Sequence, residues 1–354
     1  MRKPKIAIVL FNLGGPDRPE AIKPFLLNLF RDPAILRVPF FVRPVLARII
    51  ARARMKPATE NYALLGGKSP LLELTMAQGK ALVAALPEME ARSFVAMRYW
   101  HPFSDAAARE VLAWDPDEIV LLPLYPQYST TTTGSSLTAW REAAAKTGLM
   151  KKVTSLCCYH GDAGYVAAMV GLVRDSYTAA RAGLDATIPL RVLFSAHGLP
   201  EVIVASGDPY QHQIERTTAA VVMELAIAGL DSAVCYQSRA TPQKWIGPST
   251  EEELARAAAD GVAVLVVPIA FVSEHSETLV ELDVEYRELA HKLGVKGYFR
   301  VPAANSDPAF IGALAGLVRL ALGAGPGLCD AGERCPAEHG CCPHRQASAL
   351  GQAA

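Results

Sequence analysis

Short runs of β-branched and other apolar residues alternate along the chain with longer stretches rich in alanine and leucine. This alternation is typical of βαβ units, in which parallel strands are buried between helices. The runs that indicate strands are KIAIVLFNL, FVAMRYW, EIVLLPLYP, LRVLFSAHG, SAVCYQS and VAVLVVPIAFV. We therefore expect an α/β fold with parallel sheets whose strands are covered on both faces.

The second half of the chain repeats features of the first. VLFNLGGP at 9–16 is similar to VLFSAHGLP at 192–200, and IVLLPLYPQYSTTTTGSS is similar to VLVVPIAFVSEHSET. Two similar halves predict two Rossmann-like, doubly wound domains with a ligand in the cleft between them, outside the carboxyl ends of the strands. We expect these domains at 1–155 and 156–305, followed by an extension at 306–354 with a helix and a cysteine-rich tail.

Charge and hydropathy exclude several classes of protein. The 354 residues hold 35 basic and 35 acidic side chains, so the excess of base that a broad nucleic-acid surface needs is absent. The sequence contains no run of 18 apolar residues, so it predicts no membrane span. The first apolar run is too short for a secretion signal and lacks a cleavage site with small residues. These features favour a cytoplasmic protein.

The segment 24–56 is apolar with interleaved arginines. It is consistent with two core helices joined by a proline-rich turn. It is equally consistent with an exposed lip around an apolar ligand, in peripheral contact with a membrane surface.

The stretch at 273–288, SEHSETLVELDVEYRE, is rich in acidic residues. On an α-helix its five glutamates fall within roughly 80° of one another, and the only base in the stretch is Arg287. One interpretation is a solvated helix face. The other is a row of carboxylates at a cleft, serving a divalent cation or the removal of protons.

Two histidines and several cysteines are candidates for chemistry. His197, in SAHGLP, follows a predicted buried strand, where it is a structural residue, a base or a metal ligand. His275 lies in the acidic stretch. The tail holds four cysteines near His339 and His344, a composition that indicates zinc or an iron–sulfur cluster. Their spacing fits no common zinc finger, and an earlier cysteine could complete the set.

Seven motifs together resemble the ferrochelatase family over nearly the whole chain. In order they are NLGGP, NYALLGGKSPL, MRYWHP, PLYPQYSTTTTGSS, FSAHGLP, YQSRATPQKWIGPST and FVSEHSETLVELDVEY. The resemblance implies a chelatase of class II, with two Rossmann-like domains and a porphyrin between them. It implies a lyase that inserts Fe²⁺ into protoporphyrin IX, releases two protons and gives protohaem in the last step of haem biosynthesis.

The resemblance also implies site residues. His197 corresponds to the active-site histidine and Glu277 to its carboxylate partner, and both are expected to meet the incoming Fe²⁺. His275, Glu274 and Glu281 are expected to continue an acidic path along the helix. The residues expected to line the porphyrin pocket are Leu13, Arg54, Tyr62, Arg98, Tyr99, Tyr125 and Trp245.

Some family members carry a [2Fe–2S] cluster, and this tail resembles theirs. The expected ligands are Cys158, Cys329, Cys335 and Cys341, with Cys342 as an alternative to Cys341. Other interpretations stay open: a chelatase for coproporphyrin III or another metal, or a non-catalytic protein that binds haem or iron. Peripheral contact with the inner membrane and a homodimer are also compatible with the sequence.

Overall fold

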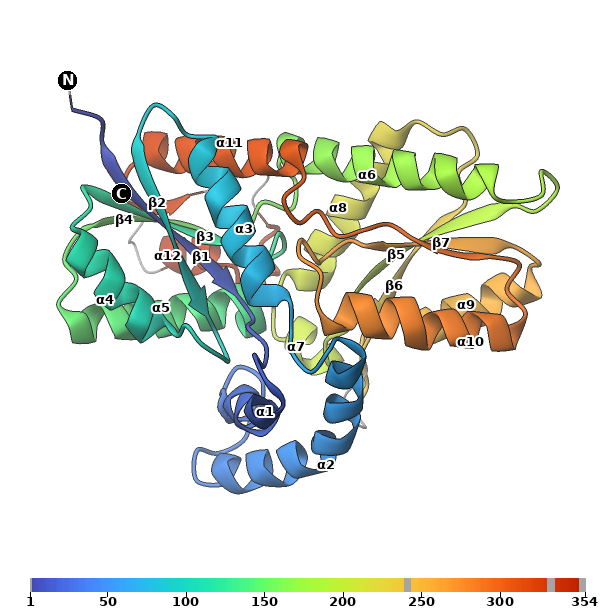
Figure 1. Cartoon of the computed structure of the whole chain (residues 1–354), viewed down its shortest axis with the longest axis horizontal. Coiled ribbons are helices and arrows are strands. Elements are labelled where there is room, and N and C mark those ends of the chain that lie inside the picture. The colour runs from blue at the N-terminus through green and yellow to red at the C-terminus, as the bar shows by residue number, and fades with distance from the viewer. Residues whose placement is uncertain (1, 239–242, 330–334, 350–354) are drawn as a thin grey trace. The chain divides into compact units, whose positions relative to one another are not determined.

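Two parallel sheets, one in each of two units of the chain, form the framework of the protein (Figure 1). The computed structural model describes residues 2–238, 243–329 and 335–349. The first unit comprises Met1–Cys158 and Leu314–Asp330, and the second comprises Tyr159–Ala313 and Ala331–Ala354. The predicted α/β class, with two Rossmann-like parallel sheets, is confirmed.

The sheet of the first unit has five parallel strands in the order β2-β1-β3-β4-β9. Strand β1 pairs with β2 on one side and with β3 on the other. All its residues from Ile6 to Asn12 are buried, as expected for an inner strand with helices on both faces. The strands are β1 (Lys5–Asn12), β2 (Glu90–Met97), β3 (Glu118–Pro123), β4 (Lys152–Leu156) and β9 (Gly327–Cys329).

Helices cover both faces of this sheet (Figure 1). On one face, Trp140 of α5 packs edge-on against Phe11 of β1, with ring centroids 6.1 Å apart. On the other face α3 comes close at Gly79, where an added Cβ would lie 3.1 Å from a methyl carbon of Leu10. Helices α1 and α2 pack against each other. The helices are α1 (Ile22–Arg31), α2 (Arg43–Leu64), α3 (Leu71–Ala84), α4 (Ser104–Trp114) and α5 (Ser135–Thr147).

The second unit has four parallel strands in the order β6-β5-β7-β8. Helices α6 and α8 lie on one face of the sheet, and α9 and α10 lie on the other (Figure 1). The strands are β5 (Leu190–His197), β6 (Ser232–Gln237), β7 (Ala263–Pro268) and β8 (Tyr298–Arg300). The helices are α6 (Ala163–Ala182), α7 (Glu201–Ala205), α8 (Tyr210–Leu225), α9 (Thr250–Ala259), α10 (Tyr286–Leu293) and α12 (Pro343–Ala349). Helix α11 (Pro308–Ala324) begins in the second unit and continues from Leu314 in the first.

The repeat predicted from the sequence is present in the topology. In each sheet the first strand of the unit lies between its second and third strands, and the fourth follows the third. The similar sequence motifs fall on equivalent strands, β1 with β5 and β3 with β7. After β3 and after β7 the chain forms π-helical turns, at Thr130–Gly134 and at Glu277–Glu285.

The expectation of one α-helix across 273–288 is wrong in part. Glu274 and His275 precede the helix, Glu277–Glu285 is π-helical, and the α-helix α10 begins only at Tyr286. A side chain that enters the backbone ladder is one cause of such distortion, and the Gln237 Nε2 atom donates to the Glu277 carbonyl oxygen at 3.0 Å. The five glutamates therefore do not form one α-helical row.

Candidate functional site

His197 is the last residue of β5, at the carboxyl end of the sheet in the second unit. Strands β6 and β7 flank β5, so the strand order reverses there. Parallel α/β sheets bind ligands at such a switch point. The His197 Nδ1 atom lies 2.6 Å from the Gly198 carbonyl oxygen, which can only accept a hydrogen bond. Nδ1 therefore carries the proton of the neutral ring, and Nε2 is its basic atom.

Glu277 lies between two imidazoles. Its Oε1 atom is 4.0 Å from Nε2 of His197, and its Oε2 atom is 3.5 Å from Nε2 of His275. The Nδ1 atom of His275 lies 3.1 Å from the Ser273 carbonyl oxygen, so this ring also keeps its Nδ1 proton and directs Nε2 at the carboxylate. Two imidazole nitrogens thus face one carboxylate, an arrangement that favours a proton between an imidazole and the carboxylate.

Glu277 and Glu281 have opposite pKa shifts. Burial raises the pKa of Glu277, but the charge of His197 and the hydrogen bond and charge of His275 outweigh it and lower the pKa to about 2. Burial and the charge of Glu277 raise the pKa of Glu281. Environments that separate two carboxyl pKa values are typical of acid–base sites, with one group ionised and the other able to hold a proton.

Three side chains from two elements hold the Glu281 carboxylate. Ser238 and Gln237, at the end of β6, donate to its Oε2 atom at 2.5 and 2.9 Å, and the Tyr286 hydroxyl donates to Oε1 at 3.2 Å. The structure therefore places Glu281 in the same neighbourhood as His197, since Gln237 pairs with His197 across β5 and β6. Neither Gln237 nor Ser238 was among the predicted site residues.

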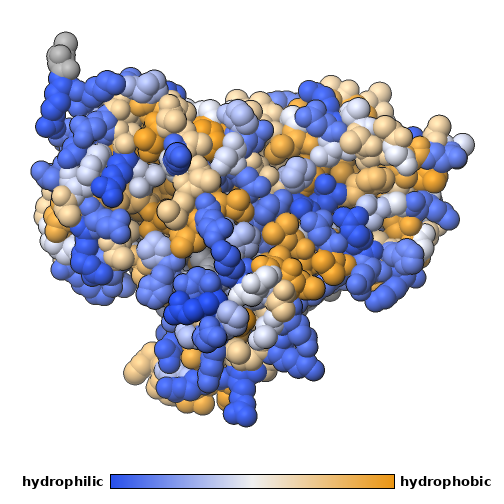
Figure 2. Space-filling view, viewed as in Figure 1, coloured by the Kyte–Doolittle hydropathy of each residue, from blue (hydrophilic) through white to orange (hydrophobic). Residues whose placement is uncertain are grey.

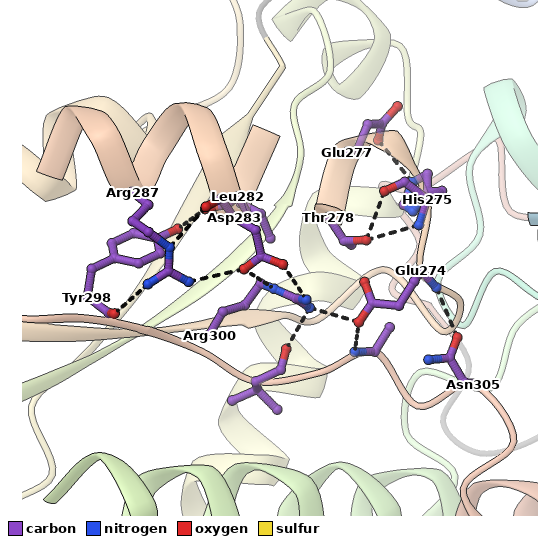
Figure 3. A network of polar contacts seen from close by, with 12 residues as sticks. Glu274, His275, Glu277, Thr278, Leu282, Asp283, Arg287, Tyr298, Arg300 and Asn305 are labelled. Atoms are coloured by element: carbon purple, nitrogen blue, oxygen red, sulfur yellow. Dashed lines mark hydrogen bonds and ion pairs between the residues drawn. The ribbon is translucent and has the colours of Figure 1, made fainter. Parts of the chain in front are cut away.

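Glu274 has a different environment (Figure 3). Its Oε1 atom accepts hydrogen bonds from Nη1 of Arg300 at 2.9 Å and from the Ala303 amide at 2.8 Å. Arg300 comes from β8, outside the acidic stretch, and it also binds Asp283. The compensating cation was therefore not visible in the sequence of the stretch. Glu285 and Glu288 are exposed, and Glu288 forms an ion pair with Lys292.

No three His, Cys or carboxylate side chains in the described part of the chain are grouped so that they could hold a metal ion. The roles predicted for His197 and Glu277 toward Fe²⁺ therefore stay predictions.

Residues expected to line the pocket gather in the first unit. Leu13, Tyr62 and Tyr99 belong to one apolar cluster with residues of α1 and α2. Tyr99 is fully buried and its hydroxyl donates to the Asp32 carboxylate at 2.8 Å. The Arg98 guanidinium binds the same carboxylate at 2.8 Å and lies over the Tyr99 ring. The buried Asp32 thus orients two expected site residues, and sequence reasoning missed it.

The other expected pocket residues lie outside this apolar cluster. Tyr125 packs against a separate core cluster, with α4 and α5, and burial raises its pKa. Arg54 is partly exposed on α2. In the second unit, the Trp245 ring lies 6.4 Å from the His197 ring. An added Cβ at Gly198 would lie 3.2 Å from the Trp245 ring, so glycine permits this close packing.

The segment 24–56 is buried in one part and exposed in another. Helix α1 buries Phe25 and Leu26, whereas the loop before α2 and its first turns are exposed. Phe40 is 79% exposed and Phe41 is 69% exposed. Over this segment Figure 2 shows apolar surface interspersed with hydrophilic surface. The exposed apolar side chains are Phe40, Phe41, Val42, Val45 and Ile49.

Cysteines lie at one edge of the first sheet. Cys158 follows β4, and the last residue of β4, Leu156, pairs with Cys329 of β9. The side chain of Cys329 lies outside the described residues. Cys157 and Cys158 are buried beside Leu328, with their sulfur atoms 3.4 Å apart.

The tail cysteines of the second unit differ in exposure. Cys335 and Cys342 are buried, and Gln213 donates to the Cys335 sulfur at 3.1 Å. Cys341 is partly exposed, and its thiol donates to the Ser206 carbonyl oxygen at 3.2 Å.

Comparisons with known proteins agree on one family. The family model described as Ferrochelatase matches residues 5–322. A ferrochelatase of Caulobacter vibrioides is 51% identical over 348 residues, covering 97% of this chain and 98% of the relative. A ferrochelatase of Phenylobacterium zucineum is 51% identical over 354 residues, covering 96% and 98%. Among solved structures, SirB from Bacillus subtilis with Fe³⁺ has a TM-score of 0.52 at 13% identity, covering 89% and 94%. At that identity the likeness concerns the fold alone.

None of the helices in the described residues is long and apolar enough to span a membrane.

Proposed function

The chain belongs to the ferrochelatase family, and we infer that it is a lyase that inserts Fe²⁺ into a porphyrin in haem biosynthesis. The observation that carries this conclusion is 51% identity to a ferrochelatase over nearly the full length of both chains. The site in the second unit has the chemistry that the reaction requires. A free-base porphyrin must lose two N–H protons as the metal enters, so a base and a route for protons are needed.

We propose that His197 is the base and that Glu277 is its partner. The Nε2 atom of His197 is the basic atom of the ring and faces the Glu277 carboxylate at 4.0 Å. Once Nε2 has accepted a proton from the porphyrin, the ionised carboxylate stabilises the imidazolium. Before that proton transfer, Fe²⁺ would meet the same carboxylate and the neutral imidazole, since both are suitable ligands for iron.

Glu281 is the proposed next acceptor. Its raised pKa lets it hold a proton that Glu277, with a pKa near 2, does not keep. His275 faces Glu277 from the other side, which supports its place in the same path. For Glu274 the support is weaker, because Arg300 and the Ala303 amide occupy one of its carboxylate oxygens.

We propose protoporphyrin IX as the porphyrin. The cluster of Leu13, Tyr62 and Tyr99 with α1 and α2 is apolar, which suits a ring with few charged substituents. Arg54 supplies a cation of the kind that a propionate would pair with, whereas the Arg98 guanidinium binds Asp32. Coproporphyrin III, a tetracarboxylate, would place two more charges against such a surface, and desolvating them is unfavourable.

An anaerobic assay with protoporphyrin IX and Fe²⁺ tests the function, with loss of porphyrin fluorescence as the signal. We expect rapid loss with wild-type protein and essentially none with His197→Ala. His291→Ala is the matched control, because His291 is exposed at the end of α10. Turnover with coproporphyrin III but not with protoporphyrin IX would assign coproporphyrin III as the substrate. Tight porphyrin binding without turnover would favour a non-catalytic binding protein.

We further propose a [2Fe–2S] cluster held by Cys158, Cys329, Cys335 and one of the last two cysteines. Thiolates are the ligands of such clusters; in the first unit Cys158 follows β4 and Cys329 ends the neighbouring β9, and in the second unit Cys335 is buried with an amide donor at its sulfur. Cys342 is the better fourth ligand, since it is buried while the Cys341 thiol contacts a carbonyl oxygen. A bound cluster would supply a one-electron redox centre, and no step of the chelation depends on it.

We also propose that the protein is cytoplasmic and touches the inner membrane through the start of α2. Exposed phenylalanines beside arginines favour the boundary between anionic head groups and lipid chains. Phe40 and Phe41 supply the apolar contact, and Arg43, Arg48 and Arg52 lie on the adjacent helix.

A further inference from the structure

The guanidinium of Arg300 connects one residue before Glu277 with one residue after it (Figure 3). Arg300 donates through Nη1 to Glu274 at 2.9 Å, through Nε to one oxygen of Asp283 at 2.8 Å and through Nη2 to the other at 2.6 Å. Glu274 precedes Glu277 by three residues, and Asp283 follows it by six. The contact with Asp283 is bidentate, which fixes direction as well as distance.

The position of Arg300 is itself fixed by the sheet. Arg300 is the last residue of β8 and pairs with Val266 of β7, the strand that leads into Glu274. Two residues earlier on β8, the Tyr298 hydroxyl donates to the Leu282 carbonyl oxygen at 2.6 Å. Alternate residues of a strand lie on one face, so β8 reaches the helical segment at two points.

The segment needs such support because its own backbone is irregular. Glu277–Glu285 is π-helical, and Glu274 and His275 lie in the loop before it. The π-helical form is rare and is frequent at functional sites. Arg300 is only 10% exposed, and its ion pairs neutralise Glu274 and Asp283 on either side of Glu277.

We propose that Arg300 is a positioning residue for iron insertion, which holds the Glu277 carboxylate against His197 by binding Glu274 and Asp283 together. This inference rests on the proposed function. Arg300 acts through the backbone of the segment and touches neither His197 nor Glu277 in the contacts that the structure gives. Its loss therefore affects the chemical step more than the binding of the porphyrin.

Arg300→Lys is the primary test, because lysine keeps the charge but lacks the planar fork needed to bind both carboxylates. Arg287→Lys is the matched control. Arg287 also binds Asp283, at 3.3 Å, but it is half-exposed and no contact joins it to Glu274 in the described structure. Both variants and wild type are assayed anaerobically with protoporphyrin IX and Fe²⁺, and the folded fraction is measured by circular dichroism at the assay temperature.

We expect Arg300→Lys to lower kcat about tenfold, with the porphyrin KM within about twofold of wild type, as for other residues that orient a functional group. Arg287→Lys should leave both constants within about twofold. Asp283→Asn should reproduce the loss, and the double variant Arg300→Lys/Asp283→Asn should lose no more than either alone, since the two residues act as one unit.

Three results would overturn the inference while wild type remains active. They are equal kcat for Arg300→Lys and Arg287→Lys, a loss that only follows the folded fraction, and a loss in KM alone. If the wild-type protein does not insert iron, the proposed function is refuted, and the inference about Arg300 is refuted with it.

Discussion

Replacing Glu277 by glutamine tests the charge at the centre of the site. The amide keeps the size of the side chain but cannot stabilise a protonated His197. Unit charges 4 Å apart interact by about 4 kcal/mol at an effective dielectric constant of about 20. The Glu277–His197 distance is 4.0 Å, and the two side chains are 26% and 35% exposed. Solvent screening reduces the interaction to about 2 kcal/mol, equivalent to about a 30-fold loss of kcat.

The assay is steady-state iron insertion under anaerobic conditions, with kcat and the porphyrin KM measured separately. The porphyrin KM should stay near the wild-type value, because the lost interaction forms only after proton transfer. Glu285→Gln is the control, since Glu285 is exposed at the end of the same segment. A loss of less than about threefold, or an equal loss in Glu285→Gln, would refute the electrostatic role of Glu277.

Three further predictions concern other parts of the structure. The pKa of Glu281 is raised on folding, so its stabilising contribution is full below the unfolded value of about 4.3 and is lost as pH rises through the folded value. Glu281→Gln should therefore unfold at the wild-type temperature at pH 4 and above it at pH 8, and the opposite order at pH 8 would contradict this. In anaerobically purified protein, Cys342→Ser should lose the visible absorption and labile sulfide of a cluster while Cys341→Ser keeps them; the reverse would assign Cys341. Phe40→Asp/Phe41→Asp should sediment with anionic vesicles about tenfold less than Met150→Asp, whose exposed side chain lies away from α2, and equal sedimentation would exclude the proposed membrane contact.

The strands that carry the site were predictable, because they are long and apolar. The runs that became β5 and β7 each end at the motif that supplies the chemistry. His197 could be assigned to a strand end from its position after LRVLFSA alone. The pairing order of the strands, by contrast, depends on contacts far apart in the sequence.

Residues that hold the site in place were not predictable in the same way. Arg300 lies 26 residues after Glu274 and 17 after Asp283, and nothing in a linear pattern joins them. Asp32 precedes a proline and reads as a loop residue, yet it binds Arg98 and Tyr99 in the core. Such contacts arise only when the sheet and its loops are assembled.

The backbone of the acidic stretch was misjudged for a physical reason. Its glutamates match an α-helical period, and no sequence signal distinguishes that pattern from a π-helical one. The Gln237 side chain, which donates to the Glu277 carbonyl oxygen from another strand, is a contact that a linear pattern does not contain. Strand β9 was also missed, because Gly327–Cys329 lies in a tail rich in glycine, alanine and cysteine.

Strand β9 is the last strand of the first sheet to be synthesised, and it pairs with β4. Thr154 of β4 donates to the Gly325 carbonyl oxygen across 171 residues of sequence, just before the β4–β9 pairing begins. At synthesis rates of about 5–20 residues per second, roughly 10 to 35 s pass between the synthesis of β4 and the synthesis of the residues that cover its edge. An uncovered strand edge is a template for pairing with another chain. The nascent protein therefore exposes the β4 edge to pairing with another chain during the interval before its C-terminal residues leave the ribosome.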